Sequence, residues 1–176
     1  MKKNVLVIAL FAIAALFSNE TTAQKFSTLD KSPMDVASFP TSYKISDKIV
    51  KITYSRPQLS GRSLEALAPK GKLWRTGANE AAEVVFYKDV TFGGKSVKAG
   101  RYTMFTIPND NEWTIILSTA ENVWGAYFYK ESEDVVKVKA KVSSSIAPIE
   151  AFSMTFDDNM NLYMGWEYTV VKVTIK

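Results

Sequence analysis

The sequence has 176 residues, contains neither cysteine nor histidine, and carries a formal net charge of +4. These two absences exclude disulfide bonds, a Ser-His-Asp triad, a Cys-His nucleophile pair and an ordinary zinc site. We therefore expect no metal and no cofactor, and any catalysis would depend on carboxylates, Tyr, Lys or Arg to move protons.

The first 23 residues have the order of a secretory signal peptide. Lys2 and Lys3 precede an apolar run over residues 5–17, and a short polar segment ends at Ala23. The run is shorter than the roughly 20 residues that a membrane-spanning helix needs. We expect cleavage after Ala23, export to the periplasm or out of the cell, and no transmembrane segment in the mature chain. We also expect no lipid anchor, since no cysteine follows the cleavage site.

Residues 24–40 are polar without clear periodicity, which indicates a linker or loosely attached arm before a domain over residues 41–176. Within that domain the pattern predicts one short helix at residues 63–67, with Ser63 as its N-cap. Elsewhere apolar and polar residues alternate with a period of two, which is typical of strands with one buried face. The strands expected from this pattern cover residues 50–55, 83–88, 101–107, 113–118, 136–142, 152–156, 162–166 and 171–175.

Turn residues separate these strands. Gly93-Gly94 between two short apolar stretches predicts a tight hairpin. Residues 157–161 read as a polar loop whose Asp and Asn side chains hydrogen-bond their own backbone. About ten short strands without crossover helices predict an all-β fold, a single antiparallel β-sandwich or jelly-roll-like domain. The alternation places Trp166 in the core.

The densest basic stretch is Lys137, Lys139 and Lys141, whose spacing of two points all three to one side of a strand. This pattern is typical of a solvated strand face or a guarded sheet edge, with an anion-binding stripe as the alternative. Neither a basic helix nor an aromatic RNA-binding motif is present, so we expect no nucleic-acid partner.

The most prominent polar cluster lies between residues 54 and 81, where three of the four arginines occur. Two of these arginines together with Glu80, on adjoining loops, would form a fork for a carboxylate, sulfate or phosphate. The alternative is a structural network in which Arg56 or Arg75 pairs with Glu80. The candidate ligand-binding residues here are Arg56, Arg75, Asn79 and Glu80.

A second candidate consists of aromatic residues around Gly125. Trp124 next to this glycine on a β scaffold could stack on a sugar ring, and Tyr127 lies close by in the sequence. The alternative is that Trp124 covers one end of the core, because cores use large aromatic side chains freely.

Five distinctive segments follow one another along the chain: Ile52-Thr53-Tyr54-Ser55-Arg56-Pro57, Leu73-Trp74-Arg75-Thr76-Gly77-Ala78-Asn79-Glu80, Ala99-Gly100-Arg101-Tyr102, Glu112-Trp113-Thr114-Ile115-Ile116 and Trp124-Gly125-Ala126-Tyr127. In this order they resemble the domain of unknown function 2911 family. The resemblance covers residues 41–176 and implies an exported bacterial protein with a signal peptide and one β-rich domain. It implies no activity, substrate or cofactor, but it directs attention to the polar cluster.

Three functions are compatible with these residues. The first is a binding module for a small polar or anionic ligand or a glycan fragment, since loops on a rigid scaffold commonly carry recognition. The second is a structural or interaction protein of the cell envelope that takes no small ligand. The third is a hydrolase with two carboxylates, for which Glu80 and Glu167 are the pair to test. We expect a binding module rather than an enzyme.

Overall fold

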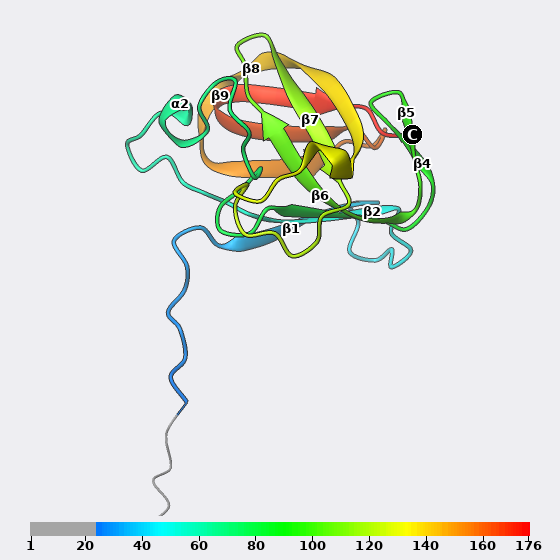
Figure 1. Ribbon diagram of the computed structural model, residues 1–176, viewed down its shortest axis with the longest axis horizontal. Coiled ribbons are helices and arrows are strands. Elements are labelled where there is room, and N and C mark those ends of the chain that lie inside the picture. The colour runs from blue at the N-terminus through cyan, green and yellow to red at the C-terminus, as the bar shows by residue number, and fades with distance from the viewer. Residues whose placement is uncertain (1–23) are drawn as a thin grey trace, which may run out of the picture.

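The computed structural model describes residues 24–176, so the predicted signal peptide lies outside the described residues. The chain forms an antiparallel seven-stranded sheet and a separate two-stranded hairpin (Figure 1). The predicted all-β antiparallel fold is confirmed. In spatial order the sheet contains β1 (Met34–Phe39), β2 (Val50–Ser55), β3 (Ala82–Phe86), β6 (Gly100–Ile107), β7 (Glu112–Ser118), β8 (Asp134–Phe156) and β9 (Leu162–Val173); the hairpin contains β4 (Val90–Phe92) and β5 (Lys95–Val97).

The sheet curls on itself because β8 is 23 residues long and serves two neighbours. Its first part pairs with β7 and the rest pairs with β9, with register shifts on either side of Ile149. Pro148, which has no backbone N–H, lies within the first shift, where the ladder is interrupted. The end of β8 therefore returns to the start of the sheet, where Phe152 N–H donates to the Pro57 carbonyl at 2.9 Å. Figure 1 shows β8 and β9 lying across from β1 and β2.

The core fills the space inside this curl. The predicted burial of Trp166 is confirmed, with 1% of its surface exposed. Along β8 the small apolar residues between the lysines are buried, whereas Lys137, Lys139 and Lys141 are exposed. Lys137 forms ion pairs with Glu131 and Asp134, and Lys139 pairs with Glu112. These ion pairs belong to a solvated strand face.

Three local predictions are confirmed. The helix α2 (Leu64–Leu67) begins after Ser63, whose Oγ accepts a hydrogen bond from the Ala66 N–H at 3.2 Å. Gly93 and Gly94 form the turn of the β4–β5 hairpin, and both have positive φ, as such tight turns require. Asp157 Oδ1 accepts the N–H groups of two asparagines in its own loop. A 3₁₀ helix, η1 (Glu131–Glu133), precedes β8.

The interpretation of residues 24–40 as a linker or loosely attached arm is wrong for residues 34–39. These residues form β1, which pairs antiparallel with β2 from Met34↔Ser55 to Phe39↔Val50. An edge strand buries little surface, and Ala37 is the one buried residue of β1. The apolar alternation that reveals inner strands is therefore weak here.

Two pairs of predicted strands are continuous in the structure. Residues 136–142 and 152–156 both belong to β8, and residues 162–166 and 171–173 both belong to β9. Bulges bend these strands without ending them, which a search for turn residues does not detect. None of the helices within residues 24–176 has the length and apolar character needed to cross a membrane.

Candidate functional site

The loop over residues 74–80 is anchored at its start by Trp74. The Trp74 backbone exchanges two hydrogen bonds with Thr106 of β6, at 2.7 and 2.9 Å. Its indole is buried, and its Nε1–H donates to the Gly77 carbonyl at 3.1 Å. Gly77 in turn lies against β2, since a Cβ there would be 3.2 Å from the Ser55 carbonyl oxygen. The loop is thus held between β2 and β6 with Arg75 at a defined position.

The structure brings the two predicted candidate segments side by side. Glu80 and Trp124 form an isolated antiparallel bridge. The Ala81 N–H donates to the Val123 carbonyl and the Gly125 N–H donates to the Asn79 carbonyl, both at 2.9 Å. The arginine-containing loop and the Trp124–Tyr127 segment are therefore parts of one surface, although more than 40 residues separate them in the sequence.

Arg75 and Tyr127 line one groove of about 270 Å³. Arg75 is half-buried, and its Nε is shielded from solvent without a hydrogen-bond partner. Within residues 24–176 its guanidinium forms no ion pair, in contrast to Arg56 and Arg101, which pair with Asp35 and Glu83. The groove therefore contains an uncompensated positive charge. Its other lining residues are Leu67, Pro69, Leu73, Trp74 and Ala126.

Both candidate aromatics are exposed, Trp124 by 59% and Tyr127 by 77%. The alternative in which Trp124 covers the core does not describe this indole. Gly125 lies against the Tyr127 ring, because a Cβ at this glycine would be 2.5 Å from Tyr127 Cε2. The glycine thus makes room for the tyrosine, which lines the groove, whereas Trp124 is not among the lining residues.

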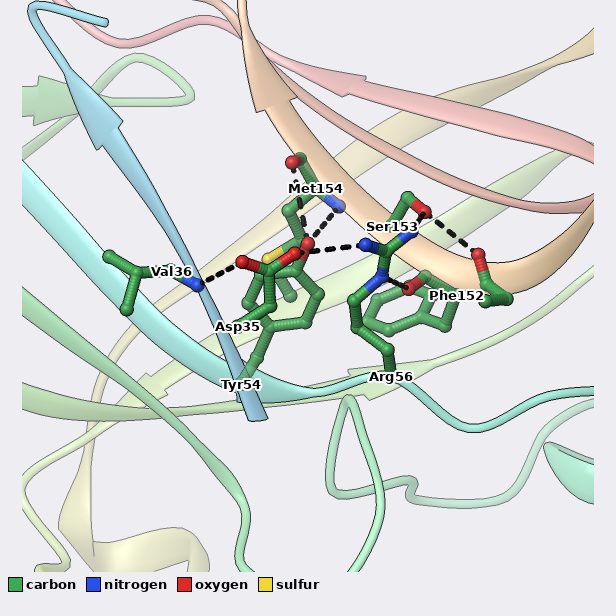
Figure 2. Close-up of polar contacts among 8 residues, drawn as sticks. Asp35, Val36, Tyr54, Arg56, Phe152, Ser153 and Met154 are labelled. Carbon is green, nitrogen blue, oxygen red and sulfur yellow. Dashed lines mark hydrogen bonds and ion pairs between the residues drawn. The ribbon is translucent and has the colours of Figure 1, made fainter. Parts of the chain in front are cut away.

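Arg56 lies elsewhere and is bound to the protein itself (Figure 2). Its guanidinium donates to the Phe152 carbonyl at 3.1 Å, to Asp35 Oδ2 at 3.0 Å and to Ser153 Oγ at 2.7 Å. These contacts join the end of β2 to β1 and to the final part of β8. The predicted fork of two arginines with Glu80 does not form, and neither Arg56 nor Arg75 pairs with Glu80 among the described residues.

Tyr54, which is buried in the core, also joins β2 to the final part of β8. Its hydroxyl accepts a hydrogen bond from the Met154 N–H at 2.8 Å and also contacts the Met154 carbonyl at 3.4 Å. Burial raises the pKa of Tyr54 above its ordinary value. Tyr54 and Arg56 together supply hydrogen-bond partners to the edge of β8 that faces away from β9, as Figure 2 shows.

The two carboxylates proposed as a catalytic pair have different neighbours. Glu80 is exposed and lines a small cavity with residues of β2 and β3. Glu167 lies in β9, half-buried, and its Oε2 accepts a long hydrogen bond of 3.4 Å from the Leu64 N–H at the start of α2. Their action as acid and nucleophile stays a prediction.

The sequence did not reveal the apolar side of the groove or the partners of Arg56. Leu67 and Leu73 carry no chemical signature, and they reach the groove only because α2 and the following turn lie beside Trp74. Asp35 belongs to the segment taken for an arm, and a strand assignment there would have placed a carboxylate next to the end of β2.

A further polar cluster lies at the start of β8. The Tyr129 hydroxyl donates to Asp134 Oδ2, which also pairs with Lys137. Burial and this hydrogen bond raise the pKa of Tyr129 to about 12, and hydrogen bonds from Lys137 to Glu131 and Asp134 raise the pKa of the lysine. In the part of the chain that the structure describes, no three acidic side chains converge in an arrangement that could hold a metal ion.

Comparison with known proteins gives one match. No curated protein and no solved structure matches the chain. A family model described as "Protein of unknown function (DUF2911)" matches residues 32–175, which begin just before β1 and include every strand of the sheet. The chain belongs to this DUF2911 family.

Proposed function

We propose that this protein is an exported binding module that takes a small anionic ligand in the groove formed by Arg75 and Tyr127. The observation that carries the proposal is Arg75, a lining residue of an open groove whose guanidinium has no ion-pair partner within residues 24–176. The surrounding loop holds this arginine in place through the buried indole of Trp74.

Electrostatics favours an anion at this position. A guanidinium presents parallel N–H donors that match the two oxygens of a carboxylate or the oxygens of a phosphate. A half-buried guanidinium without a counter-ion has lost part of its hydration and gained no ion pair in return. A bound anion supplies that missing interaction, so the free energy of binding includes a charge-assisted hydrogen bond.

The contrast with Arg56 supports a ligand-binding role for Arg75 in particular. All three nitrogens of the Arg56 guanidinium donate hydrogen bonds to groups of the protein. These three contacts favour a structural role for Arg56, which we therefore exclude from the proposed site. Asn79 and Glu80 contact residues 123–125 through their backbone, but neither belongs to the groove lining.

Ligand-induced stabilisation tests the proposal. Purified protein is titrated with carboxylates, phosphate and sulfate while the melting temperature is recorded. An anion at 100 times its Kd stabilises the fold by about 2.7 kcal/mol, which corresponds to a rise of roughly 5–10 °C for a chain of this size. The variant Arg75→Gln is expected to lose this rise.

Arg101→Gln provides the matched control, since it also removes one positive charge. Arg101 lies at the start of β6, whereas Thr106, which pairs with Trp74, lies near the end of that strand. This variant is expected to retain the full stabilisation. The proposal is wrong if no anion raises the melting temperature, or if Arg75→Gln responds as the unmodified protein does.

A further inference from the structure

We infer that the ligand of the Arg75 groove is a monocarboxylate with a small apolar body, about the size of one ring. This inference rests on the proposed function and names the chemical class of the ligand at the same site. It follows from the composition of the groove, its size and the commitment of its other polar groups.

Apart from Arg75 and the phenol of Tyr127, the side chains that line the groove are mostly apolar. Arg75 is its only ionisable side chain apart from the phenol of Tyr127. One guanidinium balances one negative charge, so a monoanion leaves no net charge in the groove. A doubly charged phosphate would retain an unbalanced charge and would lose more hydration on entering. The other lining residues are Leu67, Pro69, Leu73, Trp74 and Ala126.

Few side chains of this lining offer the hydrogen bonds that a sugar needs. The indole N–H of Trp74 is already used, since it donates to the Gly77 carbonyl. The side-chain polar groups that remain in the lining are the Arg75 guanidinium and the Tyr127 hydroxyl. A ring with several hydroxyls would give up hydrogen bonds to water without replacing them, which costs free energy for each hydroxyl. A glycan fragment is therefore disfavoured here.

The volume indicates how large an apolar body the open groove can cover. About 270 Å³ is below the range of roughly 300–1,000 Å³ that is typical of sites for drug-sized ligands. A single aromatic or aliphatic ring with a carboxylate fits this scale. Tyr127, which lies over Gly125 and is 77% exposed, can cover one face of such a ring.

The unpaired Nε of Arg75 supplies a reason for a carboxylate to bind side-on. In the free protein this N–H is shielded from solvent and makes no hydrogen bond. A change in the side-chain torsions that turns Nε–H toward the groove would let it and one Nη–H donate in parallel to the two oxygens of one carboxylate. The ligand thereby satisfies a donor that the protein leaves unsatisfied.

Isothermal titration calorimetry with a matched set of probes tests this inference. Benzoate and cyclohexanecarboxylate carry one carboxylate on an apolar ring, glucuronate carries it on a polar ring, and acetate carries it without a ring. Benzyl alcohol retains the aromatic ring without the charge, and inorganic phosphate supplies charge without an apolar body. We expect the two apolar ring carboxylates to bind at least about tenfold more tightly than each of the other probes, which corresponds to 1.4 kcal/mol.

Variants connect the binding to the groove. Arg75→Gln is expected to abolish binding of both apolar ring carboxylates. Tyr127→Ala is expected to weaken them by roughly threefold to tenfold, as the loss of an aromatic contact does, without changing the affinity for acetate. Phe128→Ala is the control, because Phe128 is 79% exposed and adjacent in sequence but is not part of the groove lining. It is expected to bind as the unmodified protein does.

The outcomes separate this inference from the proposed function. If phosphate, acetate or glucuronate binds as tightly as benzoate and requires Arg75, the ligand class is wrong and the anion-binding function stands. If benzyl alcohol matches benzoate, or if benzoate binds equally to Arg75→Gln, the charge has no role and both proposals fail. If no probe and no other anion binds, both fail as well.

Discussion

Trp74 stacks on Trp166, with ring centroids 5.4 Å apart and ring planes inclined by 19°. This contact joins the loop that carries Arg75 to β9, on the opposite layer of the curled sheet. Phe152 and Trp113 pack edge-on against the same indole, with centroids 4.9 and 6.0 Å away. The position of the candidate site therefore depends on an aromatic cluster assembled from four distant segments of the chain.

Removing this indole is expected to destabilise the fold strongly. Trp74→Ala leaves a cavity between the two layers and should lower the free energy of unfolding by about 3–5 kcal/mol. The control is Trp124→Ala, which deletes an indole that is 59% exposed and should change stability by less than about 0.5 kcal/mol. Urea denaturation measures both, and equal effects would contradict the packing described here.

Substitution of Arg56 is expected to destabilise the fold more than substitution of Arg75, because Arg56 makes more contacts within the protein. Arg56→Met removes three hydrogen bonds that connect β2 with β1 and β8, and should cost about 1–3 kcal/mol. Arg75→Met removes no ion pair within residues 24–176 and keeps most of the aliphatic packing, so the change should be below about 0.5 kcal/mol. Denaturation of the two variants in guanidinium chloride measures which loss of unfolding free energy is larger. A larger loss for Arg75→Met would mean that Arg75 is a structural residue.

The β4–β5 turn gives a matched pair of glycine substitutions. Both Gly93 and Gly94 have positive φ, so alanine at either position costs about 1–2 kcal/mol. At Gly93 the new Cβ would also lie 2.9 Å from the Val138 side chain, whereas at Gly94 it meets nothing within 4 Å. Gly93→Ala should therefore lower the melting temperature clearly more than Gly94→Ala does. Similar melting temperatures would show that the hairpin does not pack on β8.

The raised pKa of Tyr129 predicts a pH dependence at the alkaline end. Its phenol is stabilised in the neutral form by burial and by the hydrogen bond to Asp134, so the pKa is about 12 instead of 10.0. Because the folded-state pKa is the higher one, the stabilisation is complete below about pH 10 and disappears as the pH rises through about 12. Between these values the stability of the unmodified protein should fall more steeply than that of Tyr129→Phe.

Tyrosinate absorbance during an alkaline titration gives a direct measurement. The folded protein should show a tyrosine component near pH 12 that is missing in Tyr129→Phe. Tyr54 also titrates above its ordinary pKa and serves as an internal reference that the substitution leaves in place. An unchanged titration in Tyr129→Phe would assign the high pKa to another residue.

Local patterns were sufficient to predict much of the secondary structure. Alternation of apolar and polar residues located the inner strands, and the burial of Trp166 followed from it, because successive side chains of a strand point to opposite faces. Ser63 predicted the start of α2, and Gly93-Gly94 predicted the hairpin, because each acts on its own backbone within three residues. β1 escaped prediction since an edge strand needs little apolar surface.

Local sequence patterns could not predict which residues contact the candidate residues. Arg56 bonds to Asp35 and Ser153, which are 21 and 97 positions away, so the fork with Glu80 was a wrong assignment of partners. Arg75 lines a groove that also needs Leu67 and Tyr127 from two other segments, and its role in ligand binding stays a prediction. Which side chains meet depends on how the sheet curls, and that is set by bulges in β8.

The amino-acid sequence alone was enough to specify an all-β chain, its turns, its buried faces and the exclusion of histidine and cysteine chemistry. These properties arise from backbone geometry and residue type over a few neighbouring positions. Only the folded arrangement distinguished the guanidinium of Arg56, which is bound to Asp35, Ser153 and the Phe152 carbonyl, from that of Arg75, which has no ion pair within residues 24–176. Electrostatic pairing depends on distances through space, and the curl of one long strand, β8, sets those distances.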